Sequence, residues 1–435
     1  MSGDDTFLIL NKIFKPKNEE DISKIAGYTM KYGYIIDGKK VIDEVLVSYF
    51  KSPKSYTTED MCEINSHGGT LIMRKILELC IENGAELAEP GEFTKRAFLN
   101  GRIDLSQAES VIDIINAKSV REAEEGIKQL EGFLAKSIKD IKKEIMEVIT
   151  NIEVSIDYPE YDTPEVLEED LRKRIELSSI KLKKLEKSFD NGKIIKEGIK
   201  TAIIGKPNAG KSSLLNAILK EDRAIVTEFE GTTRDTIEEF VNINGIPLKL
   251  IDTAGIRETK NEVEKIGIEK SIKFAKEADL SLVIIDSSKE LTPEDNEILK
   301  IVNPNKTIII LNKNDLETKI NEDTGKIKDF KNIIKISALK QEGVEDLYKK
   351  ISDLFNLNEI NFDNDIVITN ERHKNQIQKA IKNLDKAKKS LIENMPIDIV
   401  AIGLKDVLED LGEITGEVAT EEIINEIFSR FCLGK

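Results

Sequence analysis

The chain has few of the residues from which disulfide frameworks and metal sites are built. Its 435 residues include three cysteines, Cys62, Cys80 and Cys432, and two histidines. An odd number of widely separated cysteines without metal-ligand spacing argues against a disulfide-stapled fold and against a zinc motif. The first residues show no signal-peptide pattern, so we expect a protein of the reducing cytoplasm.

Long apolar runs are also missing. A membrane-spanning helix needs about 20 consecutive apolar residues. The apolar segment Leu280 to Ile285 is short enough to be a buried strand. We therefore expect a soluble protein with no membrane span.

An excess of basic residues is missing as well. The formal net charge is −16, and such a field repels nucleic-acid phosphates over roughly the 8 Å screening length of physiological salt. Tight, indiscriminate binding of nucleic acid is not expected, and any contact with RNA must be local. The lysine-rich stretch 173–187 also contains acidic and apolar residues, a pattern typical of the solvated face of a helix.

The chain does contain a complete phosphate-binding loop. Residues 205–212 read Gly-Lys-Pro-Asn-Ala-Gly-Lys-Ser, between an apolar strand-like run at 201–204 and an amphipathic helical pattern from about Ser213. The glycines let backbone N–H groups converge on phosphate oxygens, Lys211 can reach the terminal phosphates, and the Ser212 hydroxyl can hold Mg²⁺. The sequence therefore predicts a nucleoside triphosphate site.

Four further motifs follow in the order typical of a GTPase. They are Gly-Thr-Thr-Arg-Asp at 231–235, Asp-Thr-Ala-Gly at 252–255, Asn-Lys-Asn-Asp at 312–315 and Ser-Ala-Leu at 337–339. The Asp315 carboxylate can accept the paired N–H groups of guanine, which adenine does not offer, and the stem of Lys313 can cover the base. We therefore expect GTP as the substrate. The residues predicted to surround it are Asn208, Ala209, Gly210, Lys211, Ser212, Ser213, Thr227, Glu228, Phe229, Glu230, Gly231, Thr232, Thr233, Asp252, Thr253, Ala254, Gly255, Asn312, Lys313, Asp315, Ser337 and Ala338.

The same motifs predict a magnesium site. Ser212 and Thr233 are expected to bind Mg²⁺ directly, while Asp252, which follows a predicted strand, is expected to hold it through water. The segments around Thr233 and Asp252 are expected to become ordered only around a γ-phosphate.

The motif at 252–255 lacks a catalytic glutamine. Its next residue is Ile256, where many small GTPases have a glutamine that orients the attacking water, and an isoleucine cannot do this. Hydrolysis must then use another group, and the candidates are Glu264 and Asn208. The Asn208 carbonyl could coordinate a monovalent cation, or Asn208 could be a simple turn residue after Pro207.

Length and pattern predict two to three domains of different classes. A small α+β domain precedes a helical domain, into which a Ras-like, doubly wound α/β GTPase domain is inserted. The predicted boundaries are 1–100 for the α+β domain, 101–195 and 357–435 for the two parts of the helical domain, and 196–356 for the GTPase domain.

Local patterns give sharper expectations. Residues 41–50 have a strong strand pattern and 70–83 a helical one. The Asn244-Gly245 pair predicts a tight hairpin turn. An amphipathic helix is expected to run to about Phe189 and to end at Asn191-Gly192.

With its motifs in this order, the chain resembles the MnmE (TrmE) family of tRNA modification GTPases over nearly its whole length. Besides the GTPase motifs, three stretches carry the resemblance: Glu-Pro-Gly-Glu-Phe-Thr-Lys-Arg-Ala-Phe-Leu-Asn-Gly-Arg at 89–102, the block at 251–256 leading to Glu264, and Phe-Cys-Leu-Gly-Lys at 431–435. In that family a folate-binding domain, a helical domain and an inserted GTPase cooperate with a flavin-containing partner to modify the wobble uridine of certain tRNAs.

The resemblance implies how the missing glutamine is replaced. It implies that Asn208, Thr227, the Phe229 carbonyl and Thr232 surround a K⁺ ion. It also implies that Glu264 organises the hydrolytic water.

The resemblance further implies a one-carbon site. Glu63 and Arg102 would contact a tetrahydrofolate derivative in its 5,10-methylene or 5-formyl form. Cys432 would lie at or near the modification site, with the C-terminal Lys435 counted among the site residues. A half-buried thiol near a flexible tail is an equal interpretation of Cys432.

The implied assembly is a homodimer whose GTPase domains meet when GTP is bound. Together with an FAD-containing partner of the MnmG (GidA) type it would form a heterotetramer that adds a carboxymethylaminomethyl-type group at C5 of the uridine. The same GTPase motifs would also suit a regulatory GTPase for ribosome or RNA assembly, without one-carbon chemistry. Residues 89–102 and the C-terminal tail favour the first interpretation, because an assembly factor has no evident reason to carry them.

Overall fold

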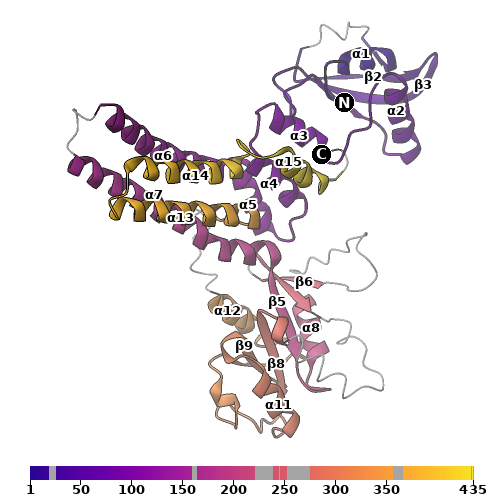
Figure 1. Ribbon diagram of the computed structural model, residues 1–435. Coiled ribbons are helices and arrows are strands. Elements are labelled where there is room, and N and C mark those ends of the chain that lie inside the picture. Colours follow the sequence, from indigo (N-terminus) through magenta and orange to yellow (C-terminus); the bar gives the residue numbers. More distant parts are fainter. Residues whose placement is uncertain are drawn as a thin grey trace. The chain divides into compact units, whose positions relative to one another are not determined.

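The computed structural model forms two compact units (Figure 1). The first comprises residues 1–112, 129–140 and 408–435, and the second comprises 113–128 and 141–407. The residues that the structure describes are 1–18, 26–158, 164–220, 239–243, 245–251, 275–355, 366–432 and 434. Among them, none of the helices combines the length and the hydropathy that crossing a membrane requires.

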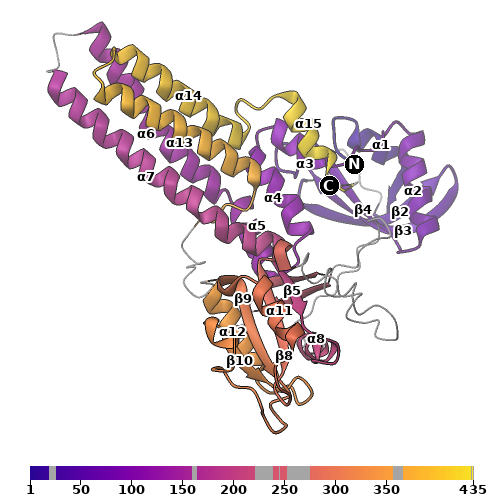
Figure 2. The same ribbon diagram turned by 60° about the horizontal axis from the view of Figure 1, so that its bottom comes forward.

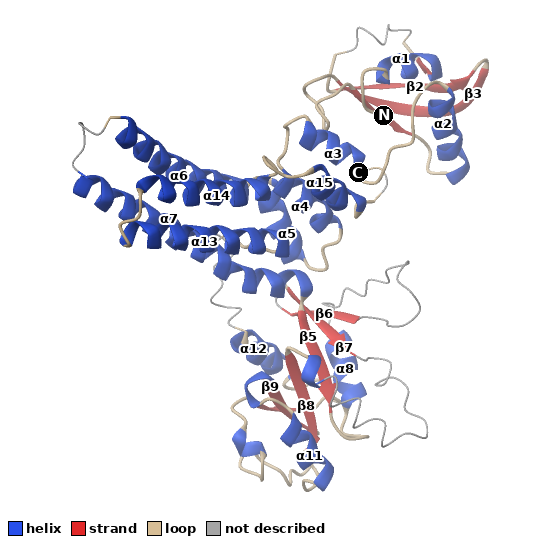
Figure 3. Ribbon diagram, viewed as in Figure 1, coloured by secondary structure: helices blue, strands red, loops and turns tan. Residues whose placement is uncertain are grey.

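The first unit contains a small antiparallel sheet in the order β1-β2-β3-β4 (Figure 3). Its elements are α1 (Thr6–Ile13), β1 (Phe14–Pro16), β2 (Thr29–Asp37), β3 (Lys40–Phe50), β4 (Met61–Asn65) and α2 (Thr70–Glu82). Along β3, Val45, Val47 and Tyr49 are buried, whereas the intervening Leu46 is exposed. This alternation packs one face of the sheet on α1 and α2. The strand predicted at 41–50 and the helix predicted at 70–83 are confirmed.

Three further helices of the first unit share a second, smaller core. They are α3 (Glu92–Leu99), α4 (Leu105–Ile115) and α15 (Glu421–Ser429). Ala97, Leu105 and Ala108 are fully buried, and Phe428 and Phe431 from the end of the chain pack with them. Phe428 and Phe431 thereby fix the end of α15 to the segment that follows residue 89.

Long helices dominate the start and the end of the second unit. They are α5 (Val120–Leu130), α6 (Phe133–Asp157), α7 (Pro164–Glu197), α13 (Glu371–Ile392) and α14 (Ile397–Thr415). Figures 1 and 2 show α7 and α13 side by side. Since these neighbours flank the α/β part in sequence, that part is an insertion in a helical domain, as the sequence predicted.

The prediction that Asn191-Gly192 ends the helix was wrong. α7 continues to Glu197, and Ile195 near its end is fully buried. A Cβ added at Gly192 would lie 1.9 Å from the carbonyl oxygen of Ile368. Glycine therefore stands here because another segment crosses the helix backbone at close range.

The inserted part is a six-stranded sheet in the order β10-β9-β8-β5-β7-β6. Its elements are β5 (Ile199–Ile204), α8 (Lys211–Lys220), β6 (Glu239–Ile243), β7 (Ile246–Ile251), β8 (Leu280–Asp286), α11 (Pro293–Ile301), β9 (Thr307–Asn312), β10 (Ile333–Ile336) and α12 (Val344–Leu354), with 3₁₀ turns at Pro304–Lys306 and Ile327–Asp329. All neighbouring strands are parallel except β6 and β7. Residues of β8 and β9 are buried on both faces, as expected for a parallel sheet covered by helices.

The antiparallel pair at the sheet edge is the predicted hairpin. Ile243 pairs with Ile246, and the Gly245 N–H donates to Asn242 Oδ1 at 2.8 Å. Gly245 has a φ of 87°, which a hairpin of this length requires. Asn244 itself lies outside the described residues.

Candidate functional site

The carboxyl ends of the parallel strands bring the described GTPase motifs to one edge of the sheet (Figure 3). The loop at 205–212 follows β5, Asn312 ends β9, and Ser337 follows β10. Ligands of open α/β sheets bind at this edge. The fold therefore collects motifs that are more than 100 residues apart in the sequence.

The loop after β5 has the backbone of a phosphate cradle. Asn208 and Gly210 have φ values of 62° and 107°, in the region that glycine, and less readily asparagine, adopts. A Cβ added at Gly205 would lie 2.5 Å from the carbonyl oxygen of Ile284 on β8. Gly205 thus allows the close approach of two strands, whereas Gly210 allows the loop to turn.

Lys211 folds back over this loop from the start of α8. Its Nζ donates to the carbonyl oxygens of Gly205 at 2.6 Å and Lys206 at 2.8 Å. Burial lowers the Lys211 pKa, because it removes water from the charged ammonium. A phosphate at the N-terminus of α8, where Ser212 and Ser213 follow, would replace the lost solvation with opposite charge.

Asn312 joins the phosphate loop to the loop after β10. Its Nδ2 donates to the carbonyl of Ala209 at 2.8 Å, and its Oδ1 accepts from the backbone N–H of Ala338 at 3.0 Å. The side chain is buried, with 3 % of its surface exposed. Both ends of the amide are used, so Asn312 holds the two loops at a fixed separation.

Lys313 is held by a residue that sequence reasoning missed. Its Nζ lies 2.6 Å from Oδ2 of Asp286, the last residue of β8. Burial alone would raise the Asp286 pKa, but hydrogen bonds from Lys313 and Ser288 together hold that pKa below its ordinary value. The sequence signal that could have identified Asp286 was its position as an acidic residue directly after six apolar or small strand residues. The ion pair fixes the end of the Lys313 side chain to the last residue of β8.

Asp315 is supported from the neighbouring loop. Its Oδ1 accepts a hydrogen bond from the Ser337 hydroxyl at 2.7 Å, and this bond is the main reason that the Asp315 pKa is lowered. Asp315 is therefore ionised at neutral pH, as a carboxylate must be to accept two N–H groups of guanine.

Sequence reasoning also missed how the phosphate loop is anchored to α11. Lys206 Nζ lies 2.6 Å from Oδ2 of Asp295, which is 3 % exposed. The same Nζ donates to the Thr292 hydroxyl at 2.9 Å. Thr292 and Asp295 form a capping box at the start of α11, and the Thr-x-x-Asp spacing was the available sequence signal.

Several predicted site residues lie outside the described residues. They are Thr227, Glu228, Phe229, Glu230, Gly231, Thr232, Thr233, Asp252, Thr253, Ala254, Gly255, Glu264 and Lys435. Among the residues that are described, no group of three or more His, Cys, Asp or Glu side chains could hold a metal ion. The predicted magnesium ligand within the described part is Ser212.

The two predicted folate residues belong to the first unit but are not joined there. Glu63 lies on β4 and is exposed. Arg102 donates to the carbonyl of Tyr56 at 3.1 Å, and its guanidinium lies 4.7 Å from the centre of the Tyr56 ring. Arg102 is thus oriented by Tyr56, and no hydrogen bond or ion pair links it to Glu63 within the described part of the chain.

The structure brings together the two stretches outside the GTPase that carried the resemblance. The backbone N–H of Gly91 donates to the carbonyl of Cys432 at 3.3 Å. Gly91 has a φ of 69°, and an added Cβ would lie 2.8 Å from Phe431. The exposed Cys432 thiol is therefore held by its backbone on the start of α3, a contact that the sequence pattern did not predict.

A mostly parallel sheet with a glycine loop before α8, and Asn312, Lys313 and Asp315 after β9, defines the class of P-loop GTPases. Two protein-family models match the chain: "GTP-binding protein TrmE N-terminus" over residues 1–102 and "MnmE helical domain" over residues 105–432. The chain belongs to the MnmE (TrmE) family of tRNA modification GTPases.

Curated relatives are similar to this chain over nearly their whole length. The chain is 48% identical over 439 residues to "tRNA modification GTPase MnmE" of Acetivibrio thermocellus, covering 100% of this chain and 95% of the relative. It is 49% identical over 440 residues to the protein of the same name from Thermoanaerobacter pseudethanolicus, with the same coverage. Among solved structures, the G domain of the T. maritima FeoB iron transporter is 25% identical, covers 36% of this chain and 98% of its own, and has a TM-score of 0.27.

Proposed function

We propose that this chain hydrolyses GTP as part of the modification of wobble uridines in tRNA. The observation that carries the GTP half of this proposal is the Asn312 bridge. It fixes the phosphate loop to the Ser337-Ala338 loop, and Asp315 and Lys313 lie beside it with their own partners. The tRNA half rests on membership of the family and on the similarity to relatives named tRNA modification GTPases, such as those of A. thermocellus and T. pseudethanolicus.

The chemistry of the site fits a triphosphate with Mg²⁺. We propose that Ser212 and Thr233 bind the metal ion, with Asp252 acting through water, and that Lys211 neutralises charge on the terminal phosphates. Its present carbonyl partners can be exchanged for phosphate oxygens, because the ammonium donates to either. Glu264 would orient the water that attacks the γ-phosphate.

We propose K⁺ in place of an arginine finger. Its ligands would be Asn208, Thr227, the Phe229 carbonyl and Thr232. The described part of this set is Asn208. Its φ of 62° suits both a potassium ligand and a simple turn residue after Pro207.

A potassium experiment separates these two roles. GTP hydrolysis is compared in KCl and NaCl at equal ionic strength for the wild type and for Asn208→Gly, which keeps the positive φ but removes the side-chain carbonyl. The proposal predicts a wild-type rate at least ten-fold higher in KCl, and a Gly variant with the same low rate in both salts. Equal wild-type rates in KCl and NaCl would remove the cation from the mechanism.

The remaining parts of the proposal concern the assembly. We propose that residues 1–100 bind a tetrahydrofolate one-carbon carrier through Glu63 and Arg102, and that Cys432 lies near the modification site. The chain would act as a homodimer and form a heterotetramer with an FAD-containing partner. Residues 196–356 would form the GTPase domain and 101–195 with 357–435 the helical domain that transmits its cycle.

The tRNA role is tested by mass analysis of wobble nucleosides. Cells that lack the gene are complemented with the wild type or with Lys211→Ala, which removes the phosphate-loop ammonium. We expect the 5-substituted uridine to disappear without the gene and to return only with the wild type. An unchanged nucleoside profile in the deletion strain would leave a GTPase without this role.

A further inference from the structure

Helix α13 is strongly basic in an acidic protein. It carries seven Lys and Arg residues against two Asp and Glu residues, whereas the whole chain has a net charge of −16. Its buried side consists of Ile377, Ala380, Leu384 and similar residues, which pack on α7. The charge is therefore concentrated on the side that faces solvent.

Four of these lysines form a row. Lys379, Lys382, Lys386 and Lys389 are all exposed, and their spacing of three, four and three residues places them on one face of the helix. At 1.5 Å per residue the row is roughly 15 Å long. We call this row the α13 lysine face.

Three members of this face have no acidic partner. Within the described part of the chain, no carboxylate lies within 4 Å of Lys379, Lys382 or Lys386, and Lys386 donates to an amide, Asn383 Oδ1, at 3.0 Å. The neighbouring α7 is different. Lys181 pairs with Glu144, and Arg174 lies within hydrogen-bond distance of both Asp170 and Glu147. Arg174 and Lys181 of α7 are thus engaged in ion pairs within the helical domain, whereas Lys379, Lys382 and Lys386 have no such pair with a described residue. The fourth member of the α13 lysine face, Lys389, lies 3.6 Å from Glu393 at the end of its own helix.

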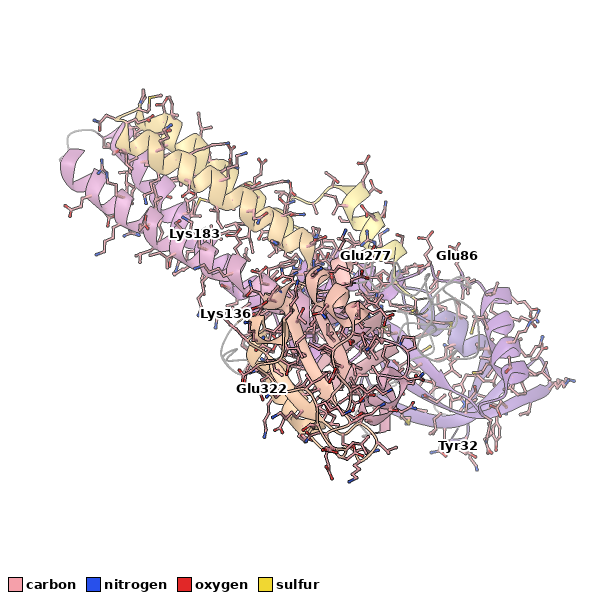
Figure 4. The ribbon with its side chains drawn as sticks, turned by 90° about the horizontal axis from the view of Figure 1, so that it is seen from below. Tyr32, Glu86, Lys136, Lys183, Glu277 and Glu322 are labelled. Carbon is pink, nitrogen blue, oxygen red and sulfur yellow. The ribbon has the colours of Figure 1, made fainter. Side chains whose placement is uncertain are left out.

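Two adjacent shallow hollows lie along the α13 lysine face. One, of about 510 Å³, is lined by three cations and three amides and by no carboxylate, namely Arg372, Asn375, Gln376, Gln378, Lys379 and Lys382. The other, of about 500 Å³, shares Gln378 and Lys382 and continues to Lys389. Its two carboxylates are engaged, because Asp385 lies 3.6 Å from Lys183 of α7 and Glu186 accepts from Gln378 at 2.9 Å. Figure 4 labels Lys183 on that helix.

We propose that the α13 lysine face and its two hollows bind the phosphate backbone of the RNA substrate. This inference rests on the proposed tRNA function and assigns a surface to it. Lysines and amides that donate hydrogen bonds, without base-reading geometry, are the groups that position a nucleic acid through its phosphates. A protein partner is disfavoured, since from 371 to 389 the helix has no exposed large apolar side chain, and interfaces usually depend on such anchors.

The test uses the full-length protein and a fluorescently labelled, unmodified tRNA transcript. Affinity is measured by anisotropy at several KCl concentrations for the wild type and for the triple variant Lys379→Glu, Lys382→Glu, Lys386→Glu. We expect at least ten-fold weaker binding at about 100 mM salt, and a salt slope that is smaller by about two to three, because each lost phosphate contact lowers it by up to ~0.9. The Lys→Arg triple variant should bind as the wild type does.

A matched control variant changes the net charge of the protein by the same amount as the α13 variant does. Lys306, Lys328 and Lys331 are exposed lysines of the GTPase domain that have no ion pair with a described residue, and their triple change to Glu alters the net charge equally. This control should keep tRNA affinity and slope, and all variants should keep GTP hydrolysis, which shows that they fold.

The outcomes separate the surface from the function. Equal losses in the control and the α13 variant, or no loss in either, would overturn the assigned surface and leave the tRNA role intact. A wild type that binds no tRNA would overturn both. An α13 variant that keeps tRNA but no longer binds the flavoprotein partner would show instead that this face binds an acidic protein.

Discussion

At the scale of single residues, the candidate site depends on atoms that connect loops. The two ends of the Asn312 amide form hydrogen bonds with two different loops. Gly210 makes room for it, because an added Cβ would lie 2.0 Å from Asn312 Nδ2. That nitrogen cannot move away without losing its bond to Ala209. The glycine of the phosphate loop and the asparagine of the guanine motif are thus a single packed pair.

A substitution of Gly210 tests this pairing. Gly210→Ala should lower GDP affinity at least ten-fold, because the methyl group displaces Asn312 and the φ of 107° disfavours alanine. Isothermal titration with GDP measures the effect. The control is Gly38→Ala, which also has a positive φ, 59°, but has nothing within 4 Å of its added Cβ. Equal GDP affinities for the two variants would contradict the pairing.

The motifs predict a set of nucleotide-binding residues, which stays a prediction, but they did not predict the contacts that hold those residues in place. Lys211 and Asp315 were identifiable because their chemistry is read from spacing alone. The partners of Lys313 and Lys206, namely Asp286 and Asp295, were not predicted. Their local signals, the end of an apolar strand and a Thr-x-x-Asp spacing, do not indicate which lysine, more than 20 residues away, each of them contacts. The same holds for the contact between Gly91 and Cys432.

At the scale of elements, the start of α5 contains a buried acid. Glu122 is 6 % exposed; its Oε2 accepts from the Lys118 N–H at 2.7 Å, and its own N–H donates to Ser119 Oγ at 3.1 Å. Burial raises the Glu122 pKa to about 7, with a smaller contribution from Asp113, against the opposing effects of Lys118 and Lys196. Lys118 Nζ also lies 4.5 Å from the ring centre of Phe240 on β6, so this acid lies where α5 meets the GTPase sheet.

The raised pKa predicts how stability changes with pH. The folded pKa of about 7 exceeds the ordinary value of 4.5, so the folded state binds the Glu122 proton more tightly than the unfolded state does. Proton binding therefore adds to the free energy of unfolding. This added stability is fully present below about pH 4.5 and is lost as the pH rises through 7. Between pH 5 and pH 8 the free energy of unfolding of the wild type should fall by on the order of 2 kcal/mol more than that of Glu122→Gln.

Urea midpoints at both pH values measure this difference. The control is Glu124→Gln, because Glu124 is exposed on the same helix and should follow the wild type. A Glu122→Gln variant whose midpoint changes with pH as the wild type's does would show that Glu122 titrates normally.

Element boundaries were predictable where a local signal decided them. The hairpin at Gly245 and the strand at 41–50 depend on turn chemistry and on alternation within one segment. Gly192 shows where local prediction fails. Its role is set by the close approach of Ile368, whereas the local sequence shows only a glycine within a helical pattern. The α13 lysine face was not predicted for a similar reason. Lysines in sequence do not reveal which of them find acidic partners.

At the scale of the whole molecule, the order of the motifs and of the helical segments in the sequence was sufficient to predict the architecture. A phosphate loop, four later motifs and helices on either side in sequence define a GTPase inserted in a helical domain, and α7 beside α13 (Figure 2) shows how the two helical segments meet. What the sequence could not supply was the contact between the start of α3 and the end of the chain, since the two stretches are over 300 residues apart.

The proposed GTPase activity requires that the Asp315 carboxylate recognises the guanine base. Isothermal titration of the wild type and of Asp315→Asn with GDP and with XDP, in the presence of Mg²⁺, tests it most directly. An amide can still accept from Ser337 but offers xanthine a donor that guanine cannot use. We predict that the wild type prefers GDP by at least 100-fold and that the variant prefers XDP. Unchanged GDP affinity in Asp315→Asn, or no GDP binding by the wild type, would show that Asp315 does not recognise guanine.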